Sequence, residues 1–583
     1  MDPRPPERPA SDWESTPPPP SPSRHRGRRL LVILAATLVV LGGGVAAAAF
    51  FVMRGSNAEP LELVPASSEV VVTASLDPSA GQKMNLLALA HRFPALGDDQ
   101  DLRQQVNRAL DEALESSGLS RDDVLPWLGS EVVIVVDFSP DDDVVTTSAL
   151  LASTDDGAAE RALDKAMTAS RGAGQTRDYR GVTIHLFGSG SSLMGYAIVD
   201  QVVVVSNHEV GLTRVIDVSE GTTPNVVDDR DFVDTVSTLP EDKLGLVYVN
   251  PTELVSRALS DSGLGAAVGS APGLDSVRAL RSIGLSLSAQ PDGLVFDLTV
   301  RLDPSKLDPA TRESLDQPVH ENATVSLVPA NSYAVATQQG LDTNLKQVLD
   351  EALSTPEGER IRQRLGIDDA LSALTGDTTF EIGPGSGATP VGGALVLGVD
   401  DPAAVQHTLD GLADLALASQ QRASVSSPFP VQGGRSRQQM TQLRPLKPGP
   451  GPGPDVAWRT TTYQGTTIRY LVDPSLSGSG FLPAYAVLDE AALIASSPAE
   501  IRKLIDVKGG QPSITSSSAY TRALARVPSG SSSLYVDVEG IVSQFASALP
   551  PDVEANLEPI KTVVTGGTNS SSHVTARLFI EIR

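Results

Sequence analysis

The sequence predicts an α+β protein made of two tandem, internally duplicated modules, each an antiparallel sheet packed with helices, behind one transmembrane helix. Three observations lead to this prediction. Residues 30–53 form an uninterrupted apolar run. Short blocks of sequence after that run recur in the same order further along the chain. Neighbouring strand-like segments also follow one another too closely for a crossover helix, which favours antiparallel pairing.

The apolar run at residues 30–53 is predicted to be a membrane anchor. As a helix it would extend roughly 36 Å, enough to cross a hydrocarbon core of about 30 Å. Arg24, Arg26, Arg28 and Arg29 precede it, so the N-terminus is expected in the cytoplasm and the C-terminal body outside. The alternative is a cleaved signal peptide, but this run is about twice as long as the apolar core of a usual signal peptide. A lipoprotein is excluded because the chain has no cysteine.

The segments that flank the anchor are short and polar. Residues 1–29 are rich in proline and contain too little apolar surface to fold, so we expect a disordered cytoplasmic tail. That tail is either a docking or phosphorylation segment or a plain solvated extension. Residues 54–62 are predicted to be a tether that keeps the folded body close to the bilayer.

The charge and the cysteine content of the body exclude several functions. Beyond residue 54 the chain carries 38 basic against 67 acidic residues, a net charge near −29. Like charges repel, so binding of nucleic acid by this body is excluded. The absence of cysteine removes disulfides, thiolate catalysis and cysteine-based metal sites.

The outer body is predicted to be duplicated. Residues 63–68 (LVPASS) return at 327–332 as LVPANS, and LDEAL at 110–114 returns unchanged at 349–353. The matches continue in the same order. They include Tyr179 and Tyr463, Tyr196 and Tyr485, Asp217 and Asp506, Phe232 and Tyr520, and Tyr248 and Tyr535. We therefore place module 1 at residues 63–318 and module 2 at residues 319–583.

Hydrophobic periodicity predicts similar elements in both modules. Apolar spacing predicts amphipathic helices over residues 102–114 and 341–353, and further helices over 157–169 and 209–218. Strands are expected at 70–74, 131–138, 149–153, 182–187, 197–206 and 333–337. Strict alternation in the last strand of each module, residues 294–302 and 574–582, predicts one buried apolar face and one wet face.

Two segments distinguish the modules. The stretch from Asp77 to Pro94 has no counterpart in module 2. Module 2 instead carries a Pro- and Gly-rich insert at about residues 421–457, with five basic residues and few acids. We expect this insert to be a disordered loop, either contacting an anionic surface or serving as inert length variation.

No catalytic, cofactor-binding or metal-ligating residue is predicted. Motifs for phosphate binding, zinc proteases and serine hydrolases are missing, and no two of the seven histidines have metal-ligand spacing. Four clusters of aspartates could hold calcium, but their positions favour helix capping and turns. They are Asp98, Asp99 and Asp101; Asp122 and Asp123; Asp141, Asp142 and Asp143; and Asp228, Asp229 and Asp231.

Several of these residues carry a family resemblance. The segment from Leu63 through Asp77-Pro78-Ser79-Ala80-Gly81-Gln82 to Phe93-Pro94, with the later Tyr179-x-Gly181 and Tyr196-Ala197, resembles an actinobacterial single-pass membrane family. That family is catalogued as domain of unknown function thirty-three fifty-two. The resemblance covers roughly residues 58–583. It implies a single-pass protein with a large outer domain, and it supplies no catalytic residue.

The expected function is non-enzymatic binding or scaffolding at the cell envelope, by a single-pass protein with its body outside the cell membrane. Its expected partners are the membrane, spanned by residues 30–53, and an envelope protein, a lipid or a wall component. No cofactor is expected. Two alternatives stay open: a carrier of lipid or another apolar envelope molecule, and an unrecognised envelope hydrolase with a nucleophile from a Ser-rich loop.

Overall fold

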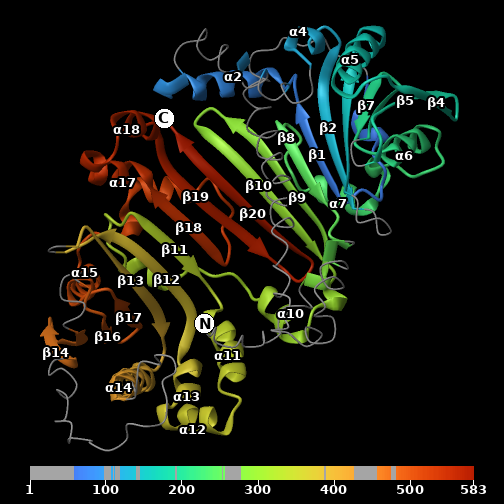
Figure 1. The fold of residues 1–583 in the computed structure, drawn as a ribbon. Coiled ribbons are helices and arrows are strands. Elements are labelled where there is room, and N and C mark those ends of the chain that lie inside the picture. Colours follow the sequence, from blue (N-terminus) through green and yellow to red (C-terminus); the bar gives the residue numbers. More distant parts are fainter. Residues whose placement is uncertain are drawn as a thin grey trace, which may run out of the picture.

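One antiparallel sheet organises the molecule, as its computed structural model shows (Figure 1). The structure describes residues 58–96, 119–138, 145–190, 193–252, 277–386, 389–425, 456–473 and 481–583, and a few single positions between these ranges. No helix within these ranges is long and apolar enough to cross a membrane. The predicted anchor, the tail and residues 54–57 of the tether lie outside the described residues, as does most of the helix expected at 102–114.

The sheet contains 20 strands, and every pairing in it is antiparallel. Ten strands come from residues before 303: β1 Val70–Ser75, β2 Leu128–Phe138, β3 Val145–Ser153, β4 Gln175–Tyr179, β5 Val182–Phe187, β6 Met194–Val199, β7 Val202–Ser206, β8 Gly245–Val249, β9 Leu280–Gln290 and β10 Gly293–Leu302. Ten come from residues after 333: β11 Ala334–Gln338, β12 Leu374–Pro384, β13 Val391–Val399, β14 Ala457–Tyr463, β15 Thr466–Val472, β16 Ala484–Val487, β17 Ala491–Ala495, β18 Ser532–Asp537, β19 Ile560–Asn569 and β20 His573–Ile582.

The strand order follows from the pairings. From one edge to the other it is β4-β5-β6-β7-β3-β2-β1-β8-β9-β10-β20-β19-β18-β11-β12-β13-β17-β16-β15-β14. The N-terminal ten strands and the C-terminal ten meet at β10 and β20, which form nine residue pairs. The expectation of a separate sheet in each half therefore differs from the structure, because this edge-to-edge pairing makes the sheet continuous.

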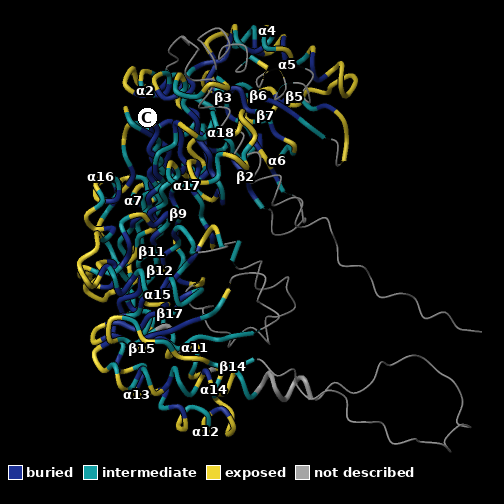
Figure 2. The backbone as a smooth tube through the Cα atoms, turned by 90° about the vertical axis from the view of Figure 1, so that its left-hand side faces the viewer, coloured by how far each residue is buried: buried dark blue, intermediate teal, exposed yellow. Residues whose placement is uncertain are grey.

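Helices cover both faces of the sheet. In the N-terminal half, α5 Asp156–Arg171 packs on the face that carries Val203, and α6 Glu209–Ser219 packs on the face that carries Val204. In the C-terminal half, α13 Ile367–Ser372 and α14 Pro402–Val425 lie on one face and α15 Pro498–Lys508 on the other. The buried strands run through the length of the elongated molecule (Figure 2). The expectation of a mixed helix and antiparallel-sheet fold is confirmed.

The remaining helices surround the central strands and the outer corners. Near the centre lie α2 Ala80–Ala90, α7 Arg230–Val236, α10 Pro309–Leu315, α16 Ser518–Leu524, α17 Val538–Phe545 and α18 Pro551–Leu557. Further out lie α4 Arg121–Val124, α11 Leu341–Ala352 and α12 Pro356–Leu365. The amphipathic helix predicted over residues 341–353 is thus present as α11.

Two local predictions are wrong. The strand expected over residues 197–206 is a hairpin, because Asp200 and Gln201 both adopt positive φ angles, 48° and 62°, and reverse the chain between β6 and β7. In β10 the buried side chains are Val295, Asp297 and Thr299, while the alternating apolar face is half-buried. The physical reason is that helices approach both faces of the central strands, so neither face is wet.

Candidate functional site

A cavity with a volume of about 1000 Å³ lies on one face of the C-terminal half. Its floor is formed by β11, β18, β19 and β20, and its walls by α10 and α11. Seventeen of its lining side chains are polar: Thr311, Ser314, Gln317, His320, Gln338, Gln339, Asp342, Thr343, Lys346, Asp350, Thr375, Ser531, Ser532, Thr565, Thr568, Asn569 and Thr575. Thirteen of these seventeen side chains bear a hydroxyl or an amide group.

The strand register explains why the floor is hollow. Gln338 pairs with Ser532, Ser532 with Gly567, and Gly567 with Ala576, so these four residues form one row on the same face. Ala576 adds only a methyl group to this row, and Gly567 adds no side chain, which lets β19 and β20 lie close together. A Cβ atom at Gly567 would lie 2.3 Å from the backbone oxygen of Thr575, so only glycine is accommodated there.

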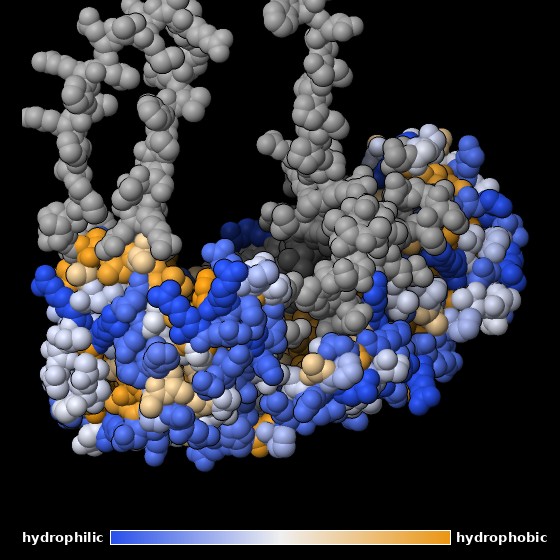
Figure 3. All heavy atoms as spheres, turned by 90° about the horizontal axis from the view of Figure 1, so that it is seen from below, coloured by the Kyte–Doolittle hydropathy of each residue, from blue (hydrophilic) through white to orange (hydrophobic). Residues whose placement is uncertain are grey.

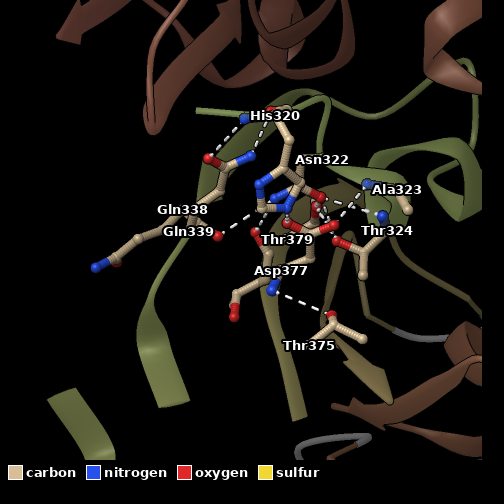
Figure 4. A network of polar contacts seen from close by, with 10 residues as sticks. His320, Asn322, Ala323, Thr324, Gln338, Gln339, Thr375, Asp377 and Thr379 are labelled. Atoms are coloured by element: carbon tan, nitrogen blue, oxygen red, sulfur yellow. Dashed lines mark hydrogen bonds and ion pairs between the residues drawn. The ribbon is translucent and has the colours of Figure 1, made fainter. Parts of the chain in front are cut away.

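His320 stands at the rim of the cavity and is held by a buried carboxylate (Figure 4). Its Nε2 atom lies 2.9 Å from Oδ1 of Asp377, a residue that is 5% exposed. The second carboxylate oxygen of Asp377 accepts a hydrogen bond from the backbone N–H of Ala323 at 2.9 Å. The pair therefore fixes both the ring of His320 and the chain that follows it.

Asn322 completes this polar network (Figure 4). Its side-chain oxygen accepts hydrogen bonds from the backbone N–H and the hydroxyl of Thr324, at 3.1 and 2.7 Å. Its amide group donates to the backbone oxygens of Gln338 and Thr378. Within the described residues, the ring of His320 bonds to Asp377 and to no serine or threonine hydroxyl. This arrangement ties the cavity rim to β11 and β12, and it lacks the geometry of an activated nucleophile.

The aspartate clusters that lie in the described residues cap helices. Ser120 and Asp123 form a reciprocal capping box at α4, and the hydrogen bonds from Ser120 lower the pKa of Asp123 to about 2. Asp229 caps α7 by accepting from the backbone N–H of Phe232. These contacts confirm the capping interpretation for both positions. The clusters at 98–101 and 141–143 lie outside the described residues.

The stretch from Asp77 to Pro94 does not line the cavity. It forms α2, whose Leu86 and Leu89 pack over the ends of β9 and β20. Arg92 donates hydrogen bonds to the backbone oxygens of Pro291 and Ile582, which belong to different halves of the chain. The segment therefore contributes to the junction between the halves. Of the insert at 421–457, residues 421–425 continue α14 and residues 426–455 lie outside the described residues.

A second cluster was missed by the sequence analysis. Glu160 and Asp164 on α5 approach His185 on β5, and the three possible ligand atoms lie within 4.8 Å of one another. The available signal was the spacing of Glu160 and Asp164, which are one helical turn apart on the same face. A histidine on a strand beside that helix could not be placed near them without the tertiary structure.

The fold defines an α+β protein built on one continuous antiparallel sheet. The chain belongs to the family described as "Protein of unknown function (DUF3352)", whose model matches residues 32–433 and 438–577. No curated protein matches the sequence.

Solved structures similar to the chain include crystal forms I and IV of a protein called TP0453, which are 12% and 11% identical to it. The match to form I covers 43% of this chain and 82% of that protein, and the match to form IV covers 42% and 80%. The TM-score is 0.22 for both. That score is too low to indicate a shared fold.

Proposed function

We propose that this protein is a non-enzymatic, membrane-anchored binding protein of the cell envelope, and that its ligand occupies the cavity between the sheet and helices α10 and α11. The observation that carries the proposal is the cavity itself, about 1000 Å³ in volume and lined mainly by hydroxyl and amide side chains. Such groups exchange hydrogen bonds with a ligand that also bears hydroxyl and amide groups. A wall-derived saccharide or peptide fragment has this chemistry.

The anchor of the proposed function is the apolar run at residues 30–53, with the basic cluster on its N-terminal side. The tail at 1–29 would stay in the cytoplasm, and the tether at 54–62 would hold the sheet near the outer surface of the membrane. The strongly acidic body is consistent with solubility beside an anionic envelope.

We further propose that the body arose by tandem duplication, with module 1 at residues 63–318 and module 2 at 319–583. The strand order supports this proposal. Read inward from one edge of the sheet, the order is β4-β5-β6-β7-β3-β2-β1-β8-β9-β10, and read inward from the other edge it is β14-β15-β16-β17-β13-β12-β11-β18-β19-β20. Each strand of the second series is the one ten positions later than its counterpart in the first. Two single bridges repeat as well: Pro65 pairs with Asn225, and Pro329 with Ser513.

Matched residues also make matched contacts. The hydroxyl of Tyr179 donates to Asp217 at 3.1 Å, and that of Tyr463 donates to Asp506 at 2.8 Å. Two edge-to-face aromatic pairs recur in the same way, Phe232 with Tyr248 and Tyr520 with Tyr535, at 4.9 and 5.1 Å between ring centres. Helical or strand periodicity alone does not produce such paired contacts.

The junction between the halves has diverged in charge. The central pair of the nine between β10 and β20 joins Asp297 to Arg577, with 2.7 Å between Oδ1 and Nε. Two identical modules would place like side chains opposite each other at this position, and like charges repel. An aspartate opposite an arginine therefore attracts the two modules to each other at a position where two identical modules would repel.

A carrier of an amphiphilic envelope molecule is the second candidate, favoured by one observation. Phe380, Ala336, Leu534 and Thr565 lie in one row across β12, β11, β18 and β19, and Thr565 lines the cavity. Phe380 and Leu534 are 47% and 37% exposed, which leaves an apolar strip beside the polar cavity. Apolar patches of this kind also interrupt the mainly hydrophilic surface in Figure 3.

Filling the cavity tests the proposed site. Ser532 is exposed and lines the cavity, so Ser532→Trp should block it and weaken binding of a soluble amino-sugar–peptide wall fragment at least about tenfold, because that loss needs only about 1.4 kcal/mol. The measurement is calorimetric titration of the full chain in nanodiscs. Thr460→Trp, at an exposed position of edge strand β14, is the matched control and should bind normally.

The same titration separates the two candidates. Unchanged binding by Ser532→Trp would contradict the cavity as the binding site. Binding of phospholipid vesicles, but not of the wall fragment, by the same full-length protein would favour the amphiphile carrier instead.

A further inference from the structure

The cluster on α5 and β5 combines two carboxylates with one imidazole. Glu160 and Asp164 occupy successive turns of α5, and His185 lies beside them on β5. The Nε2 atom of His185 is 3.7 Å from a Glu160 oxygen, and its Nδ1 atom is 3.4 Å from Oδ1 of Asp164. The structure places no lysine or arginine that it describes within ion-pair distance of either carboxylate.

Tyr196 on β6 holds this cluster in place. Its ring stacks on that of His185, with 4.4 Å between ring centres and 14° between ring planes. Its hydroxyl donates to Oδ1 of Asp164 at 2.6 Å and lies 3.1 Å from Nδ1 of His185. Asp164 and the imidazole are therefore oriented before any ligand arrives.

The corresponding position of the C-terminal half contains a permanent cation. His185 pairs with Tyr196 across β5 and β6, and Arg469 pairs with Tyr485 across β15 and β16. The guanidinium of Arg469 lies 2.8 Å from Asp410 and 2.5 Å from Asp414. The hydroxyl of Tyr485 donates to Asp410 at 2.6 Å, the same length as the bond from Tyr196 to Asp164. The two clusters thus share one aspartate and the tyrosine. They differ in the cation, and Thr168 of the N-terminal helix stands where the C-terminal helix has Asp414.

The N-terminal cluster lacks the guanidinium cation of the C-terminal cluster. In the C-terminal half a guanidinium neutralises two carboxylates. In the N-terminal half the same place holds an imidazole, which is a metal ligand when neutral, and Glu160 stands where the C-terminal helix has Gln406. The imidazole in place of the guanidinium and the carboxylate in place of the amide each put a better metal ligand at that position. Both changes therefore point to a positive ion supplied from solution.

We infer that Glu160, Asp164 and His185 bind a divalent transition-metal ion of the Zn²⁺ class, one ion per chain. Carboxylate oxygens and an imidazole nitrogen are ligands that Zn²⁺ accepts, and water would complete its coordination. Tyr196 would act as the positioning residue that orients Asp164 through its hydrogen bond. The side chains of Glu160 and Asp164 are 52% and 47% exposed, so the ion would enter directly from solvent.

The test is a Zn²⁺ titration of the full-length protein in nanodiscs against a colorimetric chelator, with the bound metal counted by mass spectrometry. The native protein should bind one Zn²⁺ per chain, and His185→Ala and Asp164→Asn should each weaken binding by at least about tenfold. His573→Ala, which removes an exposed histidine at the start of β20, should leave binding unchanged.

The decisive variant is the double substitution Glu160→Gln with His185→Arg, which introduces the counterparts of Gln406 and Arg469 from the C-terminal cluster. The introduced guanidinium would pair with Asp164, so the variant should keep the native melting temperature in metal-free buffer while losing the bound Zn²⁺. Retention of one Zn²⁺ by this folded variant would overturn the inference, as would the absence of saturable binding in the native protein. Neither outcome bears on the cavity, whose ligand is tested separately.

Discussion

Phe579→Ala is expected to lower the free energy of unfolding by about 3–5 kcal/mol, the range for a large buried aromatic side chain. Phe579 is 1% exposed and packs among Val295 of β10, Tyr535 of β18 and Val564 of β19. The guanidinium of Arg526 lies 4.5 Å from the centre of its ring. Removal of the ring therefore leaves a cavity on β20, the strand through which the two halves are joined.

The measurement is urea unfolding of the full-length protein, followed by tryptophan fluorescence. Trp127 reports on the N-terminal half and Trp458 on the C-terminal half, so single-tryptophan variants show whether both halves lose stability. Leu578→Ala is the matched control, since it lies on the opposite, half-buried face of the same strand and should cost about 1–2 kcal/mol. A loss below about 1 kcal/mol for Phe579→Ala would contradict its role at the junction.

The native protein is expected to lose stability as the pH rises from about 4.5 to 8. Glu381→Gln should abolish this decline. Glu381 lies on β12, is 2% exposed, and leaves Oε2 without a hydrogen-bond partner. Burial raises its pKa to about 8, and the nearby Glu500 adds to the rise. Because the folded state keeps a proton that the unfolded state releases in this range, the native protein loses stability as the pH rises. The loss attributable to Glu381 is on the order of 3–5 kcal/mol.

A neutral amide at position 381 removes that cost. Glu381→Gln should therefore be more stable than the native protein at pH 8 and similar to it at pH 4.5, as measured by chemical denaturation at both values. Glu313→Gln, at an exposed position on α10, controls for the loss of one negative charge. Equal stability of Glu381→Gln and the native protein at pH 8 would contradict the buried, protonated state of Glu381.

Sequence periodicity predicted well those helices and strands that bury one apolar face against a single neighbouring layer of the fold. Helices α5 and α6 and strand β5 begin and end within two residues of the expected positions, because each has one apolar face that packs on a single surface. The hairpin at Asp200 and Gln201 was missed because no glycine marks the turn and glutamine rarely adopts positive φ, so the apolar run around it resembled one strand.

The features that the sequence could not reveal depend on contacts between distant residues. In β10 the alternation was identified, but the more buried face was not, since helices approach that strand from both sides. The cavity requires α10 to stand beside β19 and β20, which come from the far end of the chain. The cluster of Glu160, Asp164 and His185 likewise requires a helix to cross a strand at one position. Only residue pairing in three dimensions brings these groups together.

The central claim is that the cavity between the sheet, α10 and α11 binds a polar envelope ligand. Hydrogen–deuterium exchange of the full-length protein, with and without a saturating amino-sugar–peptide wall fragment, tests it most directly. The account predicts slower exchange in residues 309–320, 338–346 and 565–576, which line the cavity, and no change in β4 and β14 at the sheet edges. Unchanged exchange along the cavity, or protection confined to other strands, would contradict the claim.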